Sequence, residues 1–525
     1  MHRVSLSIVV AFIAVSLGLA DQPIKSTGSI PLPVPKAAEK TAELKPLDEV
    51  WEAAYVQNVA GTDVKIGHIH MTSIPVTVDG TKLIRTTKEL RFVVGRADAH
   101  AELKADMSTD EDAQKKVHAI TARIWLGKDK VQTISGKIDG EQISVDIGAG
   151  AKQYRWDPNN VGLAAEQLLL RDRKAKPGDE FTYRYYEPQI VHPVTVKVSV
   201  KNEEDVALPG GLKRKLLKVV AAPEALTLPN GGKLNLPVGV FWADPVSFDT
   251  IKTVMDIPEI GKVSLLRTSK VAALAPNGQV PDLMKRQSIF LKAPIPDMHE
   301  RDSITYRVTF QGDAKPEELV ATDARQAIKN VKGNTFDLVM TAKRKPIGEG
   351  TEKAGEEFLR SNYFLNSDDS EVKKLAARAA GSEKDPWKKA QKIEGFVRHF
   401  MNAADYTEAM APADHVARTR TGDCTEFAML TAAMCKAQGI PARTAIGLVY
   451  VDNLLGKPGL AFHMWTEVLV NGQWLGLDAT RGQGSIGPGH IKITDHSWDG
   501  VISFTPLLPV KGFIMAQPTV EVVGK

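Results

Sequence analysis

Cysteine is scarce in this chain, which has only Cys424 and Cys435 among its 525 residues. The two are eleven residues apart in a stretch with helical spacing, which places them about 16 Å apart along one helix. A disulfide needs Cα atoms within about 7 Å of each other, so these two residues cannot pair. We therefore expect no disulfide between them and interpret Cys435 as an inert, buried core thiol.

An excess of charge of one sign is also lacking. The net charge at pH 7 is +4, from 67 Lys and Arg against 63 Asp and Glu, and the two signs are interspersed. This balance does not indicate nucleic acid or an anionic membrane surface as a partner. With 43% hydrophobic and 25% charged residues, the composition is typical of a folded globular protein. The length suggests roughly two to four domains.

Long apolar runs are absent after the first twenty residues. No later stretch reaches the about 18 apolar residues that a membrane-spanning helix needs. At the start, Arg3 precedes an apolar run from Val4 to Leu19, with small residues at positions 18 and 20. Residues 1–20 are therefore predicted to be a signal peptide, cleaved before Asp21, with an uncleaved signal anchor as the alternative. The mature protein is expected to be extracytoplasmic, either periplasmic or secreted.

Composition divides the rest of the chain into segments. Residues 21–48 are rich in proline and are predicted to be a linker. Residues 49–275 carry short, alternating, β-branched runs between turns, which predict a large antiparallel β domain interrupted by one helix near residues 161–173. A second Pro-rich linker is expected over residues 276–301, followed by a small β unit over residues 302–350.

Two histidines in the β region could in principle hold a metal. His68 and His70 alternate onto one face of a predicted strand, but no third ligand lies nearby in the sequence. A solvated strand face is the favoured interpretation. No metal and no cofactor is predicted for the chain.

Cys424 is predicted to begin a helix. Asp423 is a good N-cap, and Glu426 can reach back to the backbone N–H of that capping residue. The helix is expected to end at Gly439. Its apolar residues recur at helical spacing at Phe427, Leu430, Met434 and Ala437. Because the first turn carries free N–H groups and the positive end of the helix dipole, it favours a thiolate at Cys424.

A β-hairpin follows this helix. The dipeptide Asn471-Gly472 is a strong hairpin signal between two apolar runs, residues 461–470 and 473–480. Counting back from the turn sets two facing pairs, Trp465 with Asp478 and His463 with Thr480. His463 and Asp478 are then diagonal neighbours on one face, close enough for a hydrogen bond. A helix packed on that face would add Cys424 to complete a Cys-His-Asp trio.

Four short blocks occur in a fixed order along this region. They are Gly422-Asp-Cys-Thr-Glu426, Gly439-Ile-Pro-Ala-Arg443, His463-Met-Trp-Thr-Glu-Val468 and Trp474-Leu-Gly-Leu-Asp-Ala-Thr480. Together they resemble the core of the transglutaminase-like superfamily, in the form common in bacterial extracytoplasmic proteins, over roughly residues 355–500. The family usually has proline after the aspartate, where this chain has Ala479. That departure does not touch the chemistry.

The resemblance implies both a fold and a reaction. It implies an α+β, papain-like catalytic domain over residues 351–525, in which Cys424 is the nucleophile, His463 the general base and acid, and Asp478 the residue that orients His463. Such a trio forms a thioester on a protein or peptide carboxamide. An amine acceptor then gives a cross-link, and water gives deamidation or proteolysis. Backbone N–H groups at the helix start, and Tyr406 as a side-chain donor, are candidates for stabilising the oxyanion.

Several alternatives stay open at this stage. The same trio could serve an amidase acting on a glycopeptide or cell-wall peptide, or it could be vestigial in a binding or assembly protein. A zinc site built from Cys, His and Asp is a further chemical rival. The sequence does not indicate an oligomeric state. It also leaves calcium dependence open, because no loop has EF-hand spacing.

Overall fold

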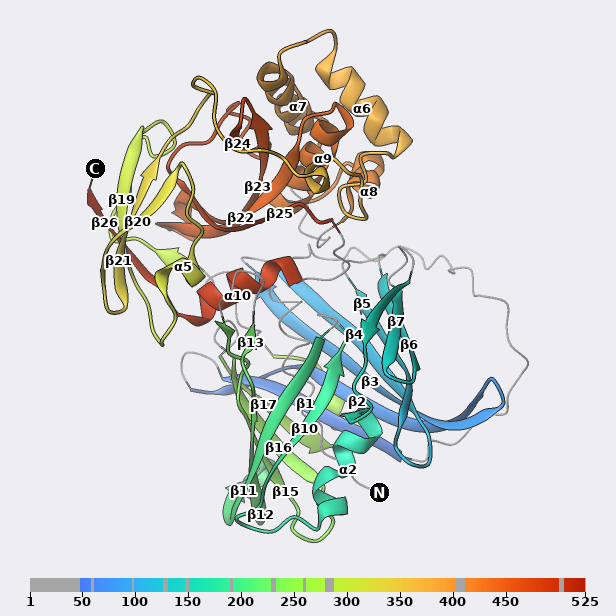
Figure 1. Cartoon of the computed structure of the whole chain (residues 1–525). Coiled ribbons are helices and arrows are strands. Elements are labelled where there is room, and N and C mark those ends of the chain that lie inside the picture. The colour runs from blue at the N-terminus through green and yellow to red at the C-terminus, as the bar shows by residue number, and fades with distance from the viewer. Residues whose placement is uncertain are drawn as a thin grey trace.

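The structure is a computed structural model. It describes residues 48–57, 61–96, 99–125, 131–146, 151–188, 192–227, 233–257, 261–278, 288–402, 411–499 and 505–524. The predicted signal peptide and nearly all of the first predicted linker lie outside these ranges. The fold is mostly β-sheet, with one large sheet in the N-terminal half and a group of helices beside smaller sheets in the C-terminal half (Figure 1). Within these ranges we find no helix that could span a bilayer.

The N-terminal half forms one sheet of fifteen strands in the order β8-β7-β6-β5-β4-β3-β2-β1-β17-β16-β15-β12-β11-β10-β9. Neighbouring strands are antiparallel except for β9 and β10. A large antiparallel β-sheet is what the sequence predicted for this region. The strands are β1 (Asp48–Gln57), β2 (Asp63–Val78), β3 (Thr81–Arg96), β4 (Ala99–Glu111), β5 (Val117–Trp125), β6 (Val131–Asp139), β7 (Gln142–Asp146), β8 (Lys152–Arg155), β9 (Asn160–Val161), β10 (Glu180–Glu187), β11 (His192–Ala207), β12 (Lys213–Pro223), β15 (Gly239–Ala243), β16 (Thr250–Ile257) and β17 (Gly261–Thr268).

This sheet has to be strongly curved. Its two edge strands, β8 and β9, are separated by only residues 156–159, which can span no more than about 18 Å. A flat sheet of this strand number would hold its edges roughly 65 Å apart. The strands of the sheet accordingly bend around a common interior (Figure 1). Strand β6 shows the resulting pattern, with exposed and buried residues alternating along it.

Helix α2 (Leu163–Arg173) is the one long helix in this half of the described chain. The sequence predicted it to begin two residues earlier. Its N-cap residue, Gly162, has no side chain to cap the helix. The Glu111 carboxylate at the end of β4 takes that role and accepts hydrogen bonds from the N–H groups of Ala164 and Ala165, at 2.8 and 3.0 Å. The start of the helix is thereby fixed against the sheet.

A small sheet of four strands follows, in the order β20-β21-β19-β26. Its strands are β19 (Ser303–Thr309), β20 (Gln326–Lys332), β21 (Thr335–Thr341) and β26 (Thr519–Gly524). The sequence assigned residues 302–350 to this unit and residues 351–525 to the catalytic domain. That division is wrong for β26, which returns from the end of the chain to pair with β19. The apolar alternation at Val520 and Val522 predicts a strand but does not name its partner.

The second sheet of the C-terminal half has the order β18-β23-β22-β25, and β24 also pairs with β23. Its strands are β18 (Ile289–Phe290), β22 (Ala442–Leu454), β23 (Lys457–Val470), β24 (Gln473–Leu477) and β25 (His490–His496). Strand β18 falls within residues 276–301, which the sequence treated as a linker. A two-residue strand carries too little alternation to be detected, and its pairing with Leu460 and Gly459 depends on the fold.

The helices of this half are α6 (Ser370–Ala380), α7 (Pro386–Phe400), α8 (Ala413–Thr419), α9 (Cys424–Ala437) and α10 (Leu508–Met515). The remaining short elements are β13 (Leu226–Thr227), β14 (Lys233–Leu234), α3 (Lys270–Ala273), α5 (Pro316–Leu319), η1 (Pro209–Gly211), η2 (Glu356–Phe358) and η3 (Thr505–Leu507). Helices α6 to α9 gather at one end of the β22–β25 sheet (Figure 1).

Helix α9 is the centre of this group. It contacts α6, α7 and α8 as well as strands β22 and β23, and every residue from Thr425 to Lys436 is buried. The sequence predicted a helix with one buried apolar face, but this helix is buried on all sides. Small residues such as Ala432 and Ala433 let neighbouring elements pack on the other faces. A helix buried on all sides holds its first residue in a fixed position.

The pairing of β26 can be tested with one buried and one exposed valine. Val520 is 6% exposed and lies opposite Val308, so in Val520→Asp a carboxylate would be buried without a partner. We expect the free energy of unfolding to fall by about 3 kcal/mol. Val523 on the same strand is 43% exposed, so Val523→Asp should change it by less than about 0.5 kcal/mol. Urea unfolding of both variants measures this, and equal effects would contradict the pairing.

Candidate active site

Cys424 is the first residue of α9, as predicted. The Asp423 carboxylate accepts a hydrogen bond from the N–H of Thr425 at 2.9 Å, and the Glu426 carboxylate accepts one from the N–H of Asp423 at 3.0 Å. Gly422 precedes this capping box with φ +139°, and a side chain there would lie 2.3 Å from Glu426. The thiol of Cys424 is free and partly exposed at the start of the helix.

Glu426 also holds the segment before the helix. Its second carboxylate oxygen accepts a hydrogen bond from the N–H of Ala411 at 2.9 Å. One buried side chain therefore ties the residue before the cysteine to the chain entering α8. Tyr406, the side-chain oxyanion donor suggested by the sequence, lies outside the described residues.

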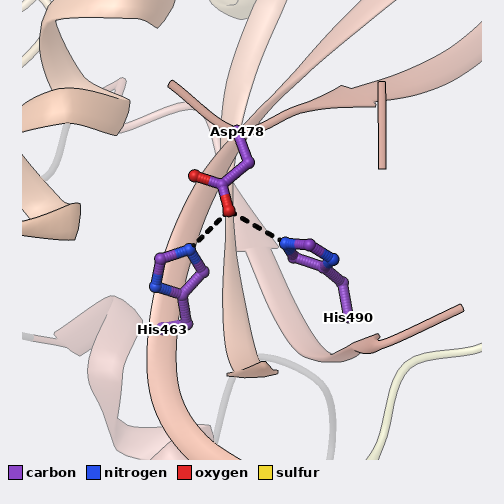
Figure 2. Close-up of side chains that lie close together, drawn as sticks. All are labelled: His463, Asp478 and His490. Carbon is purple, nitrogen blue, oxygen red and sulfur yellow. Dashed lines mark hydrogen bonds and ion pairs between the residues drawn. The ribbon is translucent and has the colours of Figure 1, made fainter. Parts of the chain in front are cut away.

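His463 and Asp478 are hydrogen bonded, as predicted. His463 Nε2 donates to Asp478 Oδ2 at 2.8 Å, and both side chains are buried, with 7% and 2% of their surface exposed (Figure 2). Thr480 completes the environment of the carboxylate, since its N–H and its hydroxyl donate to Oδ1 at 3.0 and 2.5 Å.

The hairpin register is confirmed only in part. Val470 faces Gln473 as counted from the turn, and the pairing continues to Thr466 and Leu477. The further facing pairs, Trp465 with Asp478 and His463 with Thr480, do not form, because β24 ends at Leu477. Asp478 therefore reaches His463 from the first residue after the strand.

The position of α9 differs from the expectation. The Thr466 hydroxyl donates to the carbonyl of Ala428 in α9 at 3.0 Å. Since side chains alternate along a strand, Thr466 lies on the face of β23 opposite His463 and Trp465. The body of α9 therefore packs on the opposite face from the one the sequence suggested.

A gap in the pairing of β23 lies beside His463. On that edge of β23, β24 pairs with Thr466 and the residues after it, and β18 pairs only with Gly459 and Leu460. The edge at residues 461–465 has no ladder partner among the described strands. The start of α9 nevertheless brings the Cys424 thiol within hydrogen-bonding reach of His463.

The charges of the trio favour a protonated His463. Burial by itself would lower the pKa of His463, but the negative charge of Asp478, the charge of Cys424 and hydrogen bonds to both raise it to about 10. In turn, burial would raise the pKa of Asp478, but the charge and hydrogen bond of His463 and the hydrogen bond of His490 hold it well below its usual range. The arrangement is therefore a buried carboxylate beside an imidazolium.

His490 is a neighbour that the sequence reasoning missed. It is the first residue of β25 and is fully buried, and its Nε2 donates to the same Asp478 Oδ2 at 3.0 Å (Figure 2). The alternating apolar Ile491 and Ile493 after Gly489 could have predicted a strand here. Nothing local to the sequence points His490 toward Asp478.

His463, Asp478 and His490 also form the one His, Cys, Asp or Glu group in the described ranges that is close enough to hold a metal ion, with ligand atoms within 4.8 Å of one another. Tetrahedral zinc ligands at about 2.0–2.2 Å would sit roughly 3.3–3.5 Å apart. The observed separations of 2.8 and 3.0 Å are shorter and match hydrogen bonds. Cys424 is not in the group, so the geometry does not favour a zinc site of Cys, His and Asp.

Two motif positions serve packing instead of chemistry. Arg443 and Glu467 are cross-strand partners, with Arg443 Nη2 2.7 Å from a Glu467 carboxylate oxygen. Buried Lys492 lies 3.2 Å from the same carboxylate. This buried ion cluster joins β22, β23 and β25, the strands that carry or support His463 and His490.

The other thiol and the two N-terminal histidines fall outside the site. Cys435 is fully buried, and burial raises the pKa of its thiol, as expected for an inert core residue. His70 lies 3.0 Å from the carboxylates of both Glu49 and Glu89 and stacks on Trp51. His68 and His70 belong to no metal-capable group in the part of the chain that the structure describes.

Comparisons with known sequences and solved structures give only distant similarities. No curated protein sequence matches the chain significantly. Among solved structures, a candidate cysteine protease from Cytophaga hutchinsonii has 19% identity and a TM-score of 0.28, covering 43% of this chain and 84% of its own. A β-barrel-like protein with a domain of unknown function from Brucella abortus has 10% identity and a TM-score of 0.30, covering 42% of this chain and 95% of its own. A candidate protease from Parabacteroides distasonis has 10% identity and a TM-score of 0.19, covering 74% of this chain and 65% of its own.

The family comparison is the informative one. Residues 373–479 match the model of the transglutaminase-like superfamily, and this range contains Cys424, His463 and Asp478. The resemblance inferred from the four sequence blocks is confirmed. This part of the chain, residues 373–479, belongs to the transglutaminase-like superfamily.

Proposed function

We propose that this protein is an extracytoplasmic cysteine enzyme that forms a thioester with protein or peptide carboxamides. The observation that carries the proposal is the buried Asp478–His463 hydrogen bond beside a free thiol at the start of a helix. The superfamily match supports a cysteine-based enzyme in general. The extracytoplasmic location rests on the sequence of residues 1–20 alone.

The resting state would be a thiolate paired with an imidazolium. Since His463 Nε2 donates to Asp478, Nδ1 is the ring nitrogen left to face Cys424. A positive charge on His463 and the N–H groups of the first turn of α9 both favour a negative charge on the sulfur. The sulfur itself is partly exposed at the start of the helix.

The reaction would proceed in two steps. The Cys424 thiolate attacks the carbonyl carbon of the carboxamide, the C–N bond breaks, and His463 gives its proton to the departing amine. The thioester is then attacked by an amine or by water, which loses a proton to His463, and the thiolate leaves. The backbone N–H of Cys424, which has no intrahelical partner at the first position of a helix, is suited to stabilise the oxyanion.

Cys424→Ala is the direct test, with Cys435→Ala as its matched control. The variants are incubated with a glutamine-containing casein and a primary amine and analysed by mass spectrometry. Cys424→Ala should lose activity by about 10³-fold or more, because the nucleophile is gone. Cys435→Ala should stay within about twofold, because Cys435 is buried away from the site and only a small core volume is removed.

The products decide the type of reaction. Amine incorporation would identify an acyltransferase, whereas release of ammonia without amine incorporation, or new peptide termini, would identify a hydrolase. Turnover of a cell-wall peptide but not of casein would favour the amidase alternative. If the wild type left every substrate unchanged and Cys424 reacted with iodoacetamide no faster than Cys435, the catalytic proposal would be wrong, and a binding protein would be the better description.

Asp478→Asn should move the pH profile. The neutral amide removes the charge that holds the pKa of His463 at about 10, so this pKa should fall toward 6.5. The alkaline limb of kcat/KM, which reports loss of the imidazolium proton, should then shift from about pH 10 toward neutral. We expect kcat to fall by about 10²–10⁴-fold.

Thr480→Val is the control for this experiment. It removes one hydroxyl donor to Asp478 but keeps the carboxylate, so the alkaline limb should stay within about 0.5 pH unit of the wild type. The same shift in both variants would show that the charge of Asp478 does not set the protonation of His463. Because the folded pKa of His463 lies above 6.5, its protonation also stabilises the fold below that pH, and this contribution is lost as the pH rises through about 10.

A further inference from the structure

Asp478 accepts hydrogen bonds from more partners than a Cys-His-Asp trio requires. Oδ2 accepts from His463 and from His490, and Oδ1 accepts from the N–H and the hydroxyl of Thr480. A carboxylate is acceptor-only when ionised, so each of these groups has to supply the proton. The four hydrogen bonds fix both the position and the plane of the carboxylate.

The hydrogen bond to Asp478 also fixes the tautomer of His490. Nε2 carries the proton that is donated to Asp478. Burial lowers the pKa of His490 to about 3, although the hydrogen bond and the charge of Asp478 act to raise it, so the ring is neutral and Nδ1 carries no proton. Nδ1 is buried and has no hydrogen-bond partner. This agrees with the Nε2–H tautomer, in which Nδ1 carries a lone pair and no proton.

Packing holds the ring of His490 in place from several sides. It meets Trp465 edge to face, with ring centroids 5.3 Å apart, and it lies 5.7 Å from the ring of His299 and 5.8 Å from that of His463. Trp465 is itself 1% exposed. A residue enclosed in this way cannot turn away from Asp478 without displacing its neighbours.

The backbone beneath the site brings β25 close enough for this contact. Gly447 on β22 is the ladder partner of His463, and a side chain at Gly447 would lie 1.9 Å from the carbonyl oxygen of Ile491 on β25. The missing side chain lets β25 approach β22 at the level of His463. His490, the residue before Ile491, is thereby brought to Asp478.

We propose that His490 is a positioning residue that acts on His463 through Asp478. This inference rests on the proposed function, since it concerns the same trio. The neutral imidazole of His490 holds Asp478 Oδ2 where His463 needs it, and it disperses part of the negative charge that Oδ2 places on His463. His490 acts through its hydrogen bond to Asp478 and not on a reacting atom, so it is a positioning residue and not a catalytic one.

This arrangement has an electrostatic purpose that a simple trio lacks. A carboxylate that accepts a second N–H hydrogen bond is a weaker base than one that accepts a single bond. The second histidine is neutral, so it adds a donor without adding a positive charge that would compete with the imidazolium of His463. Asp478 stays ionised, and His463 is still able to release its proton to a leaving amine.

The test compares His490→Leu with His490→Gln. Leucine fills a similar volume but cannot donate, whereas the side-chain amide of glutamine can place an N–H near the position of Nε2. We expect His490→Leu to lower kcat by about 10–100-fold with KM within about twofold, since one hydrogen bond to a charged group is lost. His490→Gln should recover kcat to within about fivefold of the wild type.

Two further measurements separate positioning from folding. Urea unfolding of both variants shows whether a loss of kcat follows a loss of stability. Nitrogen NMR of the histidine-labelled wild type should show His490 as a neutral Nε2–H tautomer from about pH 5 to pH 9, beside a protonated His463. The NMR measurement does not depend on any variant folding.

Several results would overturn the inference. The first is a kcat for His490→Leu within twofold of the wild type. The second is an equal loss of kcat in His490→Leu and His490→Gln when both variants are stably folded. The third is an NMR spectrum that shows His490 as an imidazolium or as the Nδ1–H tautomer. Stoichiometric Zn²⁺ binding that both variants abolish would replace the inference with a metal site. Failure of the proposed function is distinct, because it appears in the wild type as a lack of turnover and an unreactive Cys424.

Discussion

The buried negative charge of Asp478 is the constraint on which the site depends. An ionised carboxylate that is 2% exposed is strongly unfavourable unless its oxygens are hydrogen bonded and an opposite charge lies close by. Four hydrogen bonds and the imidazolium of His463 meet both needs. The end of β24, the start of β25 and the loop at Thr480 have to converge on this group. Misplacing any one of them would remove part of the hydrogen bonding that the buried charge needs.

The cysteine is held by a second and separate set of contacts. Glu426 ties the N-cap of α9 to the chain before α8, and the packing of α6, α7 and α8 fixes the helix itself. The thiol and the imidazole sit on two elements, α9 and β23, that also pack on each other, and the Thr466 hydroxyl of β23 donates to the carbonyl of Ala428 in α9. Support of this kind allows reacting groups to be held in a defined geometry before substrate binds.

The family blocks divide into residues that we propose to serve the reaction and residues that stabilise the sheet. Cys424, His463 and Asp478 meet at the site, while Arg443, Glu467 and buried Lys492 form an ion cluster within the same sheet. A buried ion cluster of this kind loses much of its stabilisation if one partner is removed, because a charge is then left unpaired. Arg443 and Glu467, which stand in the blocks, therefore have a structural role. A motif position is not by itself a catalytic position.

The sequence by itself determined the local features of this protein. The capping box at Asp423 and Glu426, the turn at Asn471-Gly472 and the large antiparallel sheet follow from short-range chemistry and periodicity. The capping box and the turn also led to the prediction that Cys424, His463 and Asp478 form one site. Only the tertiary structure decided which face of β23 carries α9, that β26 pairs with β19, and that His490 shares Asp478 with His463. Each of these is a contact between segments far apart in the chain. Periodicity predicts that a strand exists, but its partner is chosen by which buried surfaces and charges fit together when the whole chain has folded.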